Sequence, residues 1–229
     1  FRLIPEDDSA SVFNYMDTNS SRANIGGLNN KFIGQKIAIV GLGGTGAYIL
    51  DMVAKTPVQE IHLYDGDEFF QHNAFRSPGA ASGETLAKRM KKVQYYEEMY
   101  SKIHKHIIPH ISYISEGNVH ELNSMSYVFI CVDKNSVRKD IMHHLLQVNV
   151  PFIDVGMGIN IIDDKLIGIV RVTMGTLEKY DHLEKRIPVD DTDNDEYKSN
   201  IQIADLNALN AMMAIIKWKK KVGFYQDLE

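Results

Sequence analysis

The residues best suited to chemistry in this sequence form a series of glycines, acids and bases between positions 41 and 133. The series begins with a glycine-rich turn, whose glycines are Gly41, Gly43, Gly44 and Gly46. Glycines let the backbone turn sharply and approach a phosphate closely. A helix that begins at such a turn offers free N–H groups and a positive dipole end to an anion. The turn is therefore predicted to hold the phosphates of a nucleotide.

An acidic partner for the turn is Asp65, which follows 24 residues after Gly41. It directly follows the run Glu60–Tyr64, whose apolar residues predict a strand. A carboxylate at the end of the strand after a glycine turn can accept hydrogen bonds from ribose hydroxyls. Strand, turn, helix, strand and acid thus occur in the order typical of a nucleotide site. This order does not distinguish ATP from a dinucleotide.

Further polar groups follow Asp65 along the chain. They are Asp67, Asn73, Arg76, Lys92 and Asp133. An arginine such as Arg76 can bind phosphate oxygens with two N–H groups, and Lys92 adds a point charge. Asp133 offers the hard oxygen ligand that Mg²⁺ prefers. Such a set could neutralise charge where a carboxylate attacks a phosphate, because both partners are anionic.

The elements that must hold these residues alternate between strand and helix. Apolar runs predict strands at residues 36–40, 60–64, 111–115, 127–132 and 151–155. Helical patterns lie at residues 47–56, 86–104 and 137–148. This alternation predicts an α/β fold with a doubly wound, mostly parallel, Rossmann-like sheet. Residues 165–173 predict a C-terminal antiparallel extension, and residues 201–222 a closing helix.

The chain is expected to form one domain with an arm. Residues 1–30 are polar and predict an N-terminal arm with a loop or a short helix, and residues 31–229 predict a single α/β domain. The acidic stretch 190–200 predicts a mobile loop. Three histidines, His104, His106 and His110, are expected on a solvated surface at the exit of the helix 86–104.

The spacing of the polar residues resembles the signature of the ThiF/MoeB family, which includes proteins like the ubiquitin-activating enzymes. In that signature two acids lie one residue apart, an Asn follows six residues after the second, and an Arg three residues later. The matching residues are Asp65, Asp67, Asn73 and Arg76. Lys92 suits the lysine that follows in the family, although Lys88 and Lys91 compete for that role, and Asp133 suits the later aspartate. The resemblance spans residues 20–160, with Thr45 where leucine is common.

The resemblance implies an enzyme that adenylates the C-terminal carboxylate of a ubiquitin-like or sulfur-carrier protein, giving an acyl-adenylate and pyrophosphate. ATP and Mg²⁺ are the implied cofactors, with Asp133 as the metal ligand and Asp65 at the ribose. Asp67 and Asn73 would join the nucleotide site. Family members are homodimers in which an arginine of the arm enters the partner's site. Arg22 is the candidate for that arginine.

The cysteine content departs from the family in two respects. The single cysteine, Cys131, excludes a four-cysteine zinc site and a disulfide framework within the chain, so no zinc is expected. Some relatives carry a cysteine in a late crossover loop, but residues 176–200 contain none. Either the chemistry stops at the acyl-adenylate, or the cysteine belongs to a partner or to a segment outside this sequence. Cys131 falls within the predicted strand 127–132 and is expected to be a small buried hydrophobe.

The composition narrows the class of partner. The 229 residues are 44% hydrophobic and 24% charged, with a net charge of −5. Without a long basic run, no nucleic acid is expected as a partner, and no apolar run is long enough to span a membrane. A cytoplasmic location is expected. Two other functions stay open: an NAD(P)-dependent oxidoreductase, and a non-catalytic scaffold that binds a nucleotide.

Overall fold

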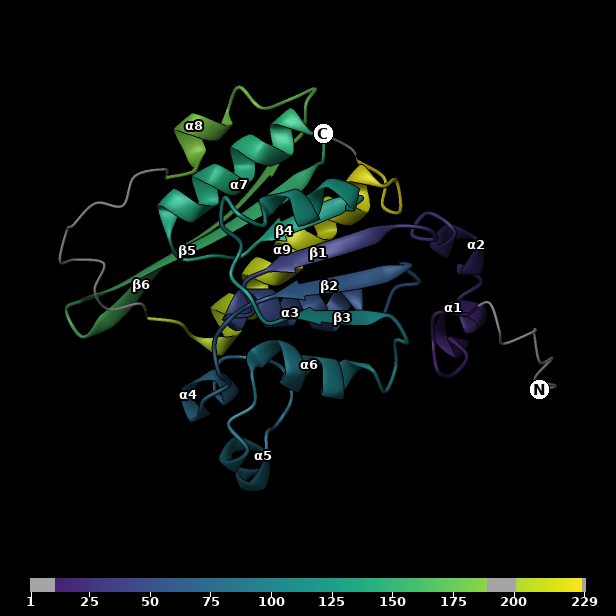
Figure 1. Ribbon diagram of the computed structural model, residues 1–229, viewed down its shortest axis with the longest axis horizontal. Helices are drawn as coiled ribbons and strands as arrows, with labels where there is room; N and C mark the ends of the chain where they lie inside the picture. Colours follow the sequence, from purple (N-terminus) through teal and green to yellow (C-terminus); the bar gives the residue numbers. More distant parts are fainter. Residues whose placement is uncertain (1–10, 189–200, 228–229) are drawn as a thin grey trace.

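The computed structural model of the chain describes residues 11–188 and 201–227 (Figure 1). Its centre is a six-stranded sheet with the order β3-β2-β1-β4-β5-β6. The strands are β1 (Lys36–Val40), β2 (Glu60–Tyr64), β3 (Ile107–His110), β4 (Tyr127–Ile130), β5 (Phe152–Ile162) and β6 (Lys165–Gly175). Neighbouring strands from β3 to β5 are parallel, and β6 pairs antiparallel to β5. The predicted doubly wound sheet with an antiparallel extension is confirmed.

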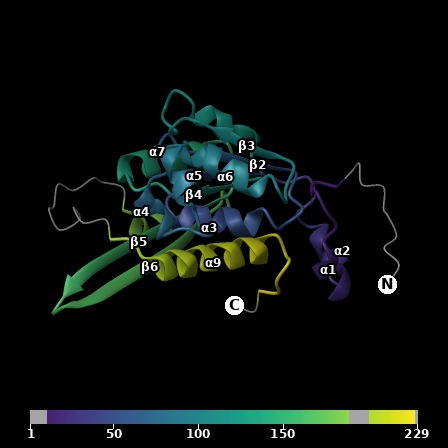
Figure 2. The ribbon, with the colours of Figure 1, turned by 90° about the horizontal axis from the view of Figure 1, so that it is seen from below.

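Helices cover both faces of this sheet (Figure 2). They are α1 (Thr18–Arg22), α2 (Gly26–Asn29), α3 (Gly44–Val53), α4 (Gln71–Ala74), α5 (Gly83–Ala87), α6 (Lys92–Tyr100), the 3₁₀ helix η2 (Val119–Ser124), α7 (Asn135–Gln147), α8 (Leu183–Arg186) and α9 (Ala204–Lys221). One core contains apolar side chains of α3, α6 and α9, and the other contains those of η2, α7 and α8. No helix in the described ranges is long and apolar enough to cross a membrane.

The strand β1 shows why the sequence pattern of a central strand is almost wholly apolar. Ile37 and Ile39 belong to the core under α3 and α9, whereas Ala38 and Val40 belong to the core under α7. Because successive side chains point to opposite faces, a strand covered on both sides has no polar face. The closing helix α9 completes one of these cores with Trp218, which is fully buried.

The predicted helix 86–104 is wrong, because the structure breaks it. α5 ends at Ala87, Arg89 has a φ of 48°, and α6 begins only at Lys92. The intervening segment pairs with the chain after β2: the N–H of Phe69 donates to the carbonyl of Met90 at 2.8 Å, and that of Lys92 to the carbonyl of Asp67 at 2.9 Å. These non-local hydrogen bonds override the local helix propensity.

The predicted strand 111–115 is also misplaced, since β3 ends at His110. Pro109 lies within β3, which is tolerated because β3 is an edge strand. Two of the other predicted elements differ only in length. α3 begins at Gly44, earlier than expected, and β5 continues to Ile162.

The long β5–β6 hairpin extends away from the rest of the chain (Figure 2). Asp163 and Asp164 both have positive φ angles, 48° and 56°, which fits the two-residue type I′ turn favoured in hairpins. The predicted mobile loop at 190–200 lies outside the described residues. Helices α1 and α2 lie in the predicted arm, and the division into an arm at 1–30 and one domain at 31–229 stays a prediction.

His104 is buried, contrary to the expectation of a solvated cluster. Its Nε2 lies 3.0 Å from the carbonyl oxygen of Val58, and its Nδ1 accepts the backbone N–H of His106 at 3.2 Å. These bonds require a neutral imidazole that carries its proton on Nε2. Burial lowers the pKa of His104 from 6.5 to about 4.

We therefore expect the free energy of unfolding to fall as the pH falls from about 6.5 to about 4. In that window the unfolded chain binds a proton at His104 that the folded chain does not. The slope for one proton is about 1.4 kcal/mol per pH unit. Urea unfolding across this range should show a shallower pH dependence for His104→Gln than for the exposed control His120→Gln. Equal slopes for the two variants would contradict this account of His104.

Candidate active site at the carboxyl ends of the strands

The candidate site lies where the winding of the sheet reverses. β1 is flanked by β2 on one side and by β4 on the other, and all three are parallel. Ligands of open α/β sheets bind in the crevice outside the carboxyl ends of the strands at such a point. The glycine turn follows β1, Asp65 follows β2, and Asp133 lies soon after β4. The fold thus gathers segments that are far apart in the sequence.

Two of the four glycines are required by the packing of the turn itself. Gly41 has a φ of 93°, and a Cβ atom there would lie 2.7 Å from the carbonyl oxygen of Cys131, at the end of β4. A Cβ atom at Gly46 would overlap the carbonyl oxygen of Gly41. Any side chain at either position would push the start of α3 away from the strand ends.

The other two glycines differ from each other in their surroundings. A Cβ atom on Gly44 would overlap the side-chain amide of Asn207. Gly43 is the N-cap of α3 and makes no side-chain cap hydrogen bond. Among the residues that the structure describes, a Cβ atom there would come no closer than 4.0 Å to another group, the side-chain oxygen of Gln202. The backbone at Gly43 is therefore the open part of the turn, where an anion can approach the N-terminus of α3.

Asn207 connects the turn to the segment that carries Arg76. Its Oδ1 accepts the hydroxyl of Thr45 at 2.9 Å, and its Nδ2 lies 3.4 Å from the carbonyl oxygen of Arg76. Asn210, one turn further along α9, instead donates to the carbonyl of Gly156 at 3.1 Å. Asn210 thus contacts β5 of the sheet, whereas Asn207 links α9 to the glycine turn and to the backbone of Arg76.

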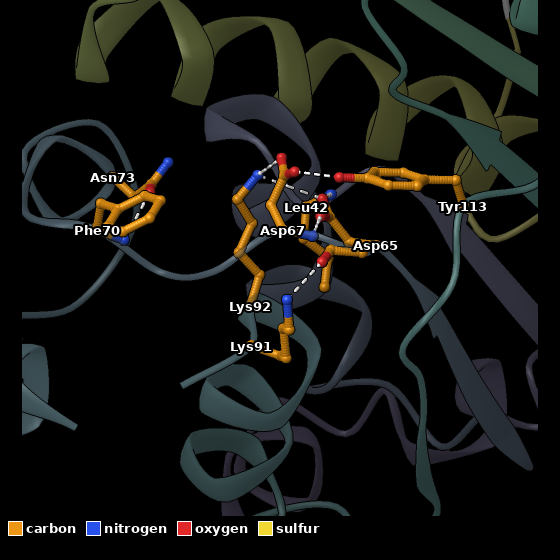
Figure 3. A network of polar contacts seen from close by, with 9 residues as sticks. Leu42, Asp65, Asp67, Phe70, Asn73, Lys91, Lys92 and Tyr113 are labelled. Carbon is orange, nitrogen blue, oxygen red and sulfur yellow. Dashed lines mark hydrogen bonds and ion pairs between the residues drawn. The ribbon is translucent and has the colours of Figure 1, made fainter. Parts of the chain in front are cut away.

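Asp65 is the centre of a polar network at the ends of β1 and β2 (Figure 3). Its Oδ2 accepts the N–H of Leu42 and its Oδ1 accepts the N–H of Asp67, both at 2.8 Å. The Nζ of Lys92 lies 3.5 Å from Asp65 and 2.6 Å from the Oδ2 of Asp67. The side chains of Asp65 and Lys92 are each 7% exposed, whereas that of Asp67 is 50% exposed. Asp65 thus fixes the glycine turn, and Asp67 is the acid that faces solvent.

Only one of the three competing lysines reaches this acid pair. Lys88 is exposed at the end of α5. Lys91 donates to the carbonyl of Gly66 at 3.1 Å. Lys92 lies at the start of α6, where the broken helix turns its side chain toward both aspartates. This geometry favours Lys92 as the phosphate-binding lysine.

Tyr113 is a member of the site that the sequence did not identify. Its hydroxyl donates to the Oδ1 of Asp67, and its ring covers Gly66 so closely that a Cβ atom there would lie 2.6 Å from it. Burial raises the pKa of Asp67, but hydrogen bonds from Lys92 and Tyr113 outweigh it and lower that pKa below its usual range. The same hydrogen bond raises the pKa of Tyr113 to about 12. An aromatic residue just after the end of β3 was the available signal, but it was assigned to a strand.

Asn73 and Arg76 come from the short helix α4 and the residues after it. The Oδ1 of Asn73 accepts the N–H of Phe70 at 2.8 Å, so its amide N–H groups are the part that suits a phosphate or ribose oxygen. Arg76 is half-buried, and its Nε is buried without a hydrogen-bond partner among the described residues. Burial lowers the pKa of Arg76, while Tyr96, Asp133 and Asp67 act in the opposite direction. A buried guanidinium N–H without an acceptor fits a site for an anion.

Asp133 is exposed and lies between β4 and α7. It does not cap α7, whose N-cap residue is Lys134. Within residues 11–188 and 201–227, no group of three or more His, Cys, Asp or Glu side chains could hold a metal ion. A single carboxylate fits Mg²⁺, which is commonly held by one or two carboxylates together with substrate phosphates and waters.

Arg22 is the one predicted residue that the fold does not bring to the site. It is exposed on α1, and α1 lies at the opposite end of the sheet from α4 (Figure 1). The chain leads from α2 into the amino end of β1, whereas the other candidate residues lie at the carboxyl ends of the strands. Within one chain, Arg22 therefore has no access to the site.

Comparisons with known proteins give one family and several similar folds. The model of the ThiF family matches residues 23–216. A crystal structure of Escherichia coli MccB with MccA-N7isoASN has a TM-score of 0.70 and 17% identity, covering 94% of this chain and 67% of that one. A structure of PaaA has a TM-score of 0.68 and 14% identity, covering 94% and 78%. The E. coli tRNA N6-threonylcarbamoyladenosine dehydratase TcdA has a TM-score of 0.52 and 18% identity, covering 63% and 65%.

These identities are low enough that the structural neighbours show the fold alone. The chain spans about two thirds of the length of the MccB and TcdA chains. A search of curated protein sequences finds no match.

We expect Gly43→Ala to weaken ATP binding at least about tenfold, because the new methyl group blocks the open N-terminus of α3. The fold should tolerate the change: Gly43 has a φ of −69° and no close neighbour for a Cβ atom. The free energy of unfolding should change by less than about 1 kcal/mol. Calorimetric titration with ATP and urea unfolding measure the two effects. Unchanged ATP affinity in a stable variant would show that phosphates do not bind at this turn.

Proposed function

The chain belongs to the ThiF family, a family of adenylyltransferases, and we propose that it uses ATP to adenylate the C-terminal carboxylate of a ubiquitin-like or sulfur-carrier protein. The observation that carries this proposal is the convergence of cations and an acid over the glycine turn. Lys92 and Arg76 lie within the electrostatic reach of Asp67, and Asp133 acts on Arg76 from the end of β4. Structures of E. coli MccB with ATP, and with AMPCPP and MccA, support ATP as the substrate of this fold.

The reaction joins two anions, so neutralising charge is the main task of the protein. The acceptor's carboxylate attacks the α-phosphorus of ATP, a new C–O–P link forms, and the bond to the β-phosphate breaks to release pyrophosphate. Arg76 can bind phosphate oxygens with two parallel N–H groups. Lys92 adds a second positive charge once ATP draws it from Asp67. Positioning and electrostatics suffice, because the acceptor supplies the attacking group.

The remaining residues hold the nucleotide and its metal. The backbone at Gly43 faces the phosphates, and Asp67 and Asn73 bind the polar groups of the nucleotide. Asp65 accepts a ribose hydroxyl with a lone pair that the bonds from Leu42, Asp67 and Lys92 leave free. Asp133 would hold Mg²⁺, which when bound would offset the charge of the phosphates. A reducing cytoplasmic setting suits this ATP-dependent chemistry.

The product of this chain is proposed to be the acyl-adenylate. Burial raises the pKa of the Cys131 thiol, so it is not a reactive thiolate. A following thioester or persulfide step therefore requires a cysteine elsewhere, on a partner or on another part of the protein.

We expect Asp133→Ala to abolish ATP–pyrophosphate exchange with candidate ubiquitin-like or peptide acceptors, because it removes the metal ligand. Arg76→Ala should lower the exchange rate about 10²-fold or more, the usual effect of losing one donor to the transition state. The exposed Arg186→Ala, on α8, is the matched control and should keep full activity.

Three results would oppose this proposal. Full activity in both variants would refute the site. ATP binding without exchange for every acceptor would favour a non-catalytic scaffold, and tight NADH binding without exchange would favour an oxidoreductase.

Arg22 is proposed to act in the partner's site of a homodimer. We therefore expect two inactive variants, Arg22→Ala and Arg76→Ala, to complement each other when their chains are mixed and allowed to exchange. Random pairing places both intact residues together in about a quarter of all sites, so about a quarter of the exchange activity should return. Each variant mixed with itself is the control. Failure to recover activity, although mixed dimers form, would rule out a role of Arg22 across the interface.

A further inference from the structure

A buried ionic cluster lies beside the candidate site, on the far side of β4 from the lysine. Asp154 of β5 is fully buried. The Nε of Arg138, from α7, lies 2.7 Å from its Oδ1, and the Nη1 of Arg171, from β6, lies 2.6 Å from its Oδ2. Burial raises the pKa of Asp154, and the two guanidinium groups counteract that rise. One buried carboxylate thus anchors two arginines.

Arg138 also bonds the segment that carries Asp133. Its Nη2 donates to the carbonyl oxygen of Val132 at 2.5 Å, and its Nη1 donates to the side-chain oxygen of Asn135. Val132 and Asn135 lie on either side of Asp133 in the sequence. Each nitrogen of the guanidinium therefore has its own acceptor, and two of the three acceptors bracket the proposed metal ligand.

Arg171 differs from Arg138 in its contacts with the loop 132–135. It bonds the same carboxylate, yet in the described part of the chain it makes no hydrogen bond to residues 132–135. Stability alone does not explain the arrangement, because a buried ion pair can often be replaced by apolar side chains at little cost. The shape of the guanidinium group does explain the contacts of Arg138. The group is planar and its N–H donors have fixed directions, so it holds several acceptors in one geometry.

We propose that Arg138, anchored by Asp154, is a positioning residue that holds the loop 132–135 so that Asp133 faces the Mg²⁺ of bound ATP. Asp133 is exposed in the loop between β4 and α7, and without this anchor its carboxylate would sample many positions. Groups that orient a metal ligand typically change metal affinity 10- to 100-fold when they are mutated. The inference rests on the proposed function only for the role of Asp133 as metal ligand.

The test measures metal binding and needs no acceptor protein. Mn²⁺ replaces Mg²⁺ as a paramagnetic probe, and its binding to the chain with saturating AMPCPP is followed by water-proton relaxation. Arg138→Lys retains a charge for Asp154 but cannot bond Val132 and Asn135 together, and should weaken Mn²⁺ binding about 10-fold or more. Arg171→Lys perturbs the same buried acid without touching the loop, and should leave the Mn²⁺ affinity within about 2-fold.

The outcomes separate this inference from the proposed function. If Asp133→Asn leaves Mn²⁺ affinity unchanged, the proposed metal role of Asp133 fails. If Asp133→Asn weakens binding but Arg138→Lys behaves like Arg171→Lys, only the positioning role is overturned. Should Arg138→Lys not fold, Asn135→Ala removes one anchor and leaves the Arg138–Asp154 pair, and a loss of several-fold is expected. Unchanged affinity in that variant would equally overturn the inference.

Discussion

The site depends on keeping a positively charged lysine in a place with almost no contact with water. A buried ammonium is costly unless it is paired, and Lys92 is paired with Asp65 and Asp67. Asp65 is in turn held by the backbone N–H groups of Leu42 and Asp67. One carboxylate therefore fixes the glycine turn and the lysine relative to each other. In the proposed reaction Asp67, which is half exposed, releases Lys92 to the phosphates of ATP, while Asp65 keeps its bonds to the turn.

Two separate networks hold the opposite charges of the site. The network of Asp65, Asp67 and Lys92 lies on the β2 side of the glycine turn, and the network of Asp154 and Arg138 lies on the β4 and β5 side. Because the winding of the sheet reverses between β1 and β4, Lys92 from the first network and Asp133 beside the second lie at the same edge of the sheet as the glycine turn. Asn207 adds a link from α9, which bonds both Thr45 and the backbone of Arg76. The proposed reaction brings two anions together. It benefits from charged groups that are already fixed, because these groups need to reorganise little when the transition state forms.

The sequence predicted those parts of the fold that depend on local pattern. The runs at 36–40 and 60–64 are strands whose apolar side chains are buried, and Gly41 has the positive φ angle, 93°, that a tight turn assigns to glycine. The helix 86–104 was wrong because hydrogen bonds from residues 67–69 break it at a distance in sequence. The same limit hid Tyr113 and Arg138, because the sequence does not show that they bond Asp67 and Asp154. The order of the polar residues in the sequence identified the candidate ligands. Only the structure identifies the groups that hold those ligands in position.

The position of Arg22 then bears on how the whole site is assembled. Every other candidate residue reaches the carboxyl ends of the strands within one chain, and Arg22 lies at the other end of the sheet. If its guanidinium takes part, a single chain holds an incomplete set of cations, and pairing of two chains becomes a condition for activity. Such a site would respond to protein concentration as well as to ATP, because formation of the interface would supply the last positive charge. The buried networks described above would then be the part of the catalytic machinery that each chain forms alone.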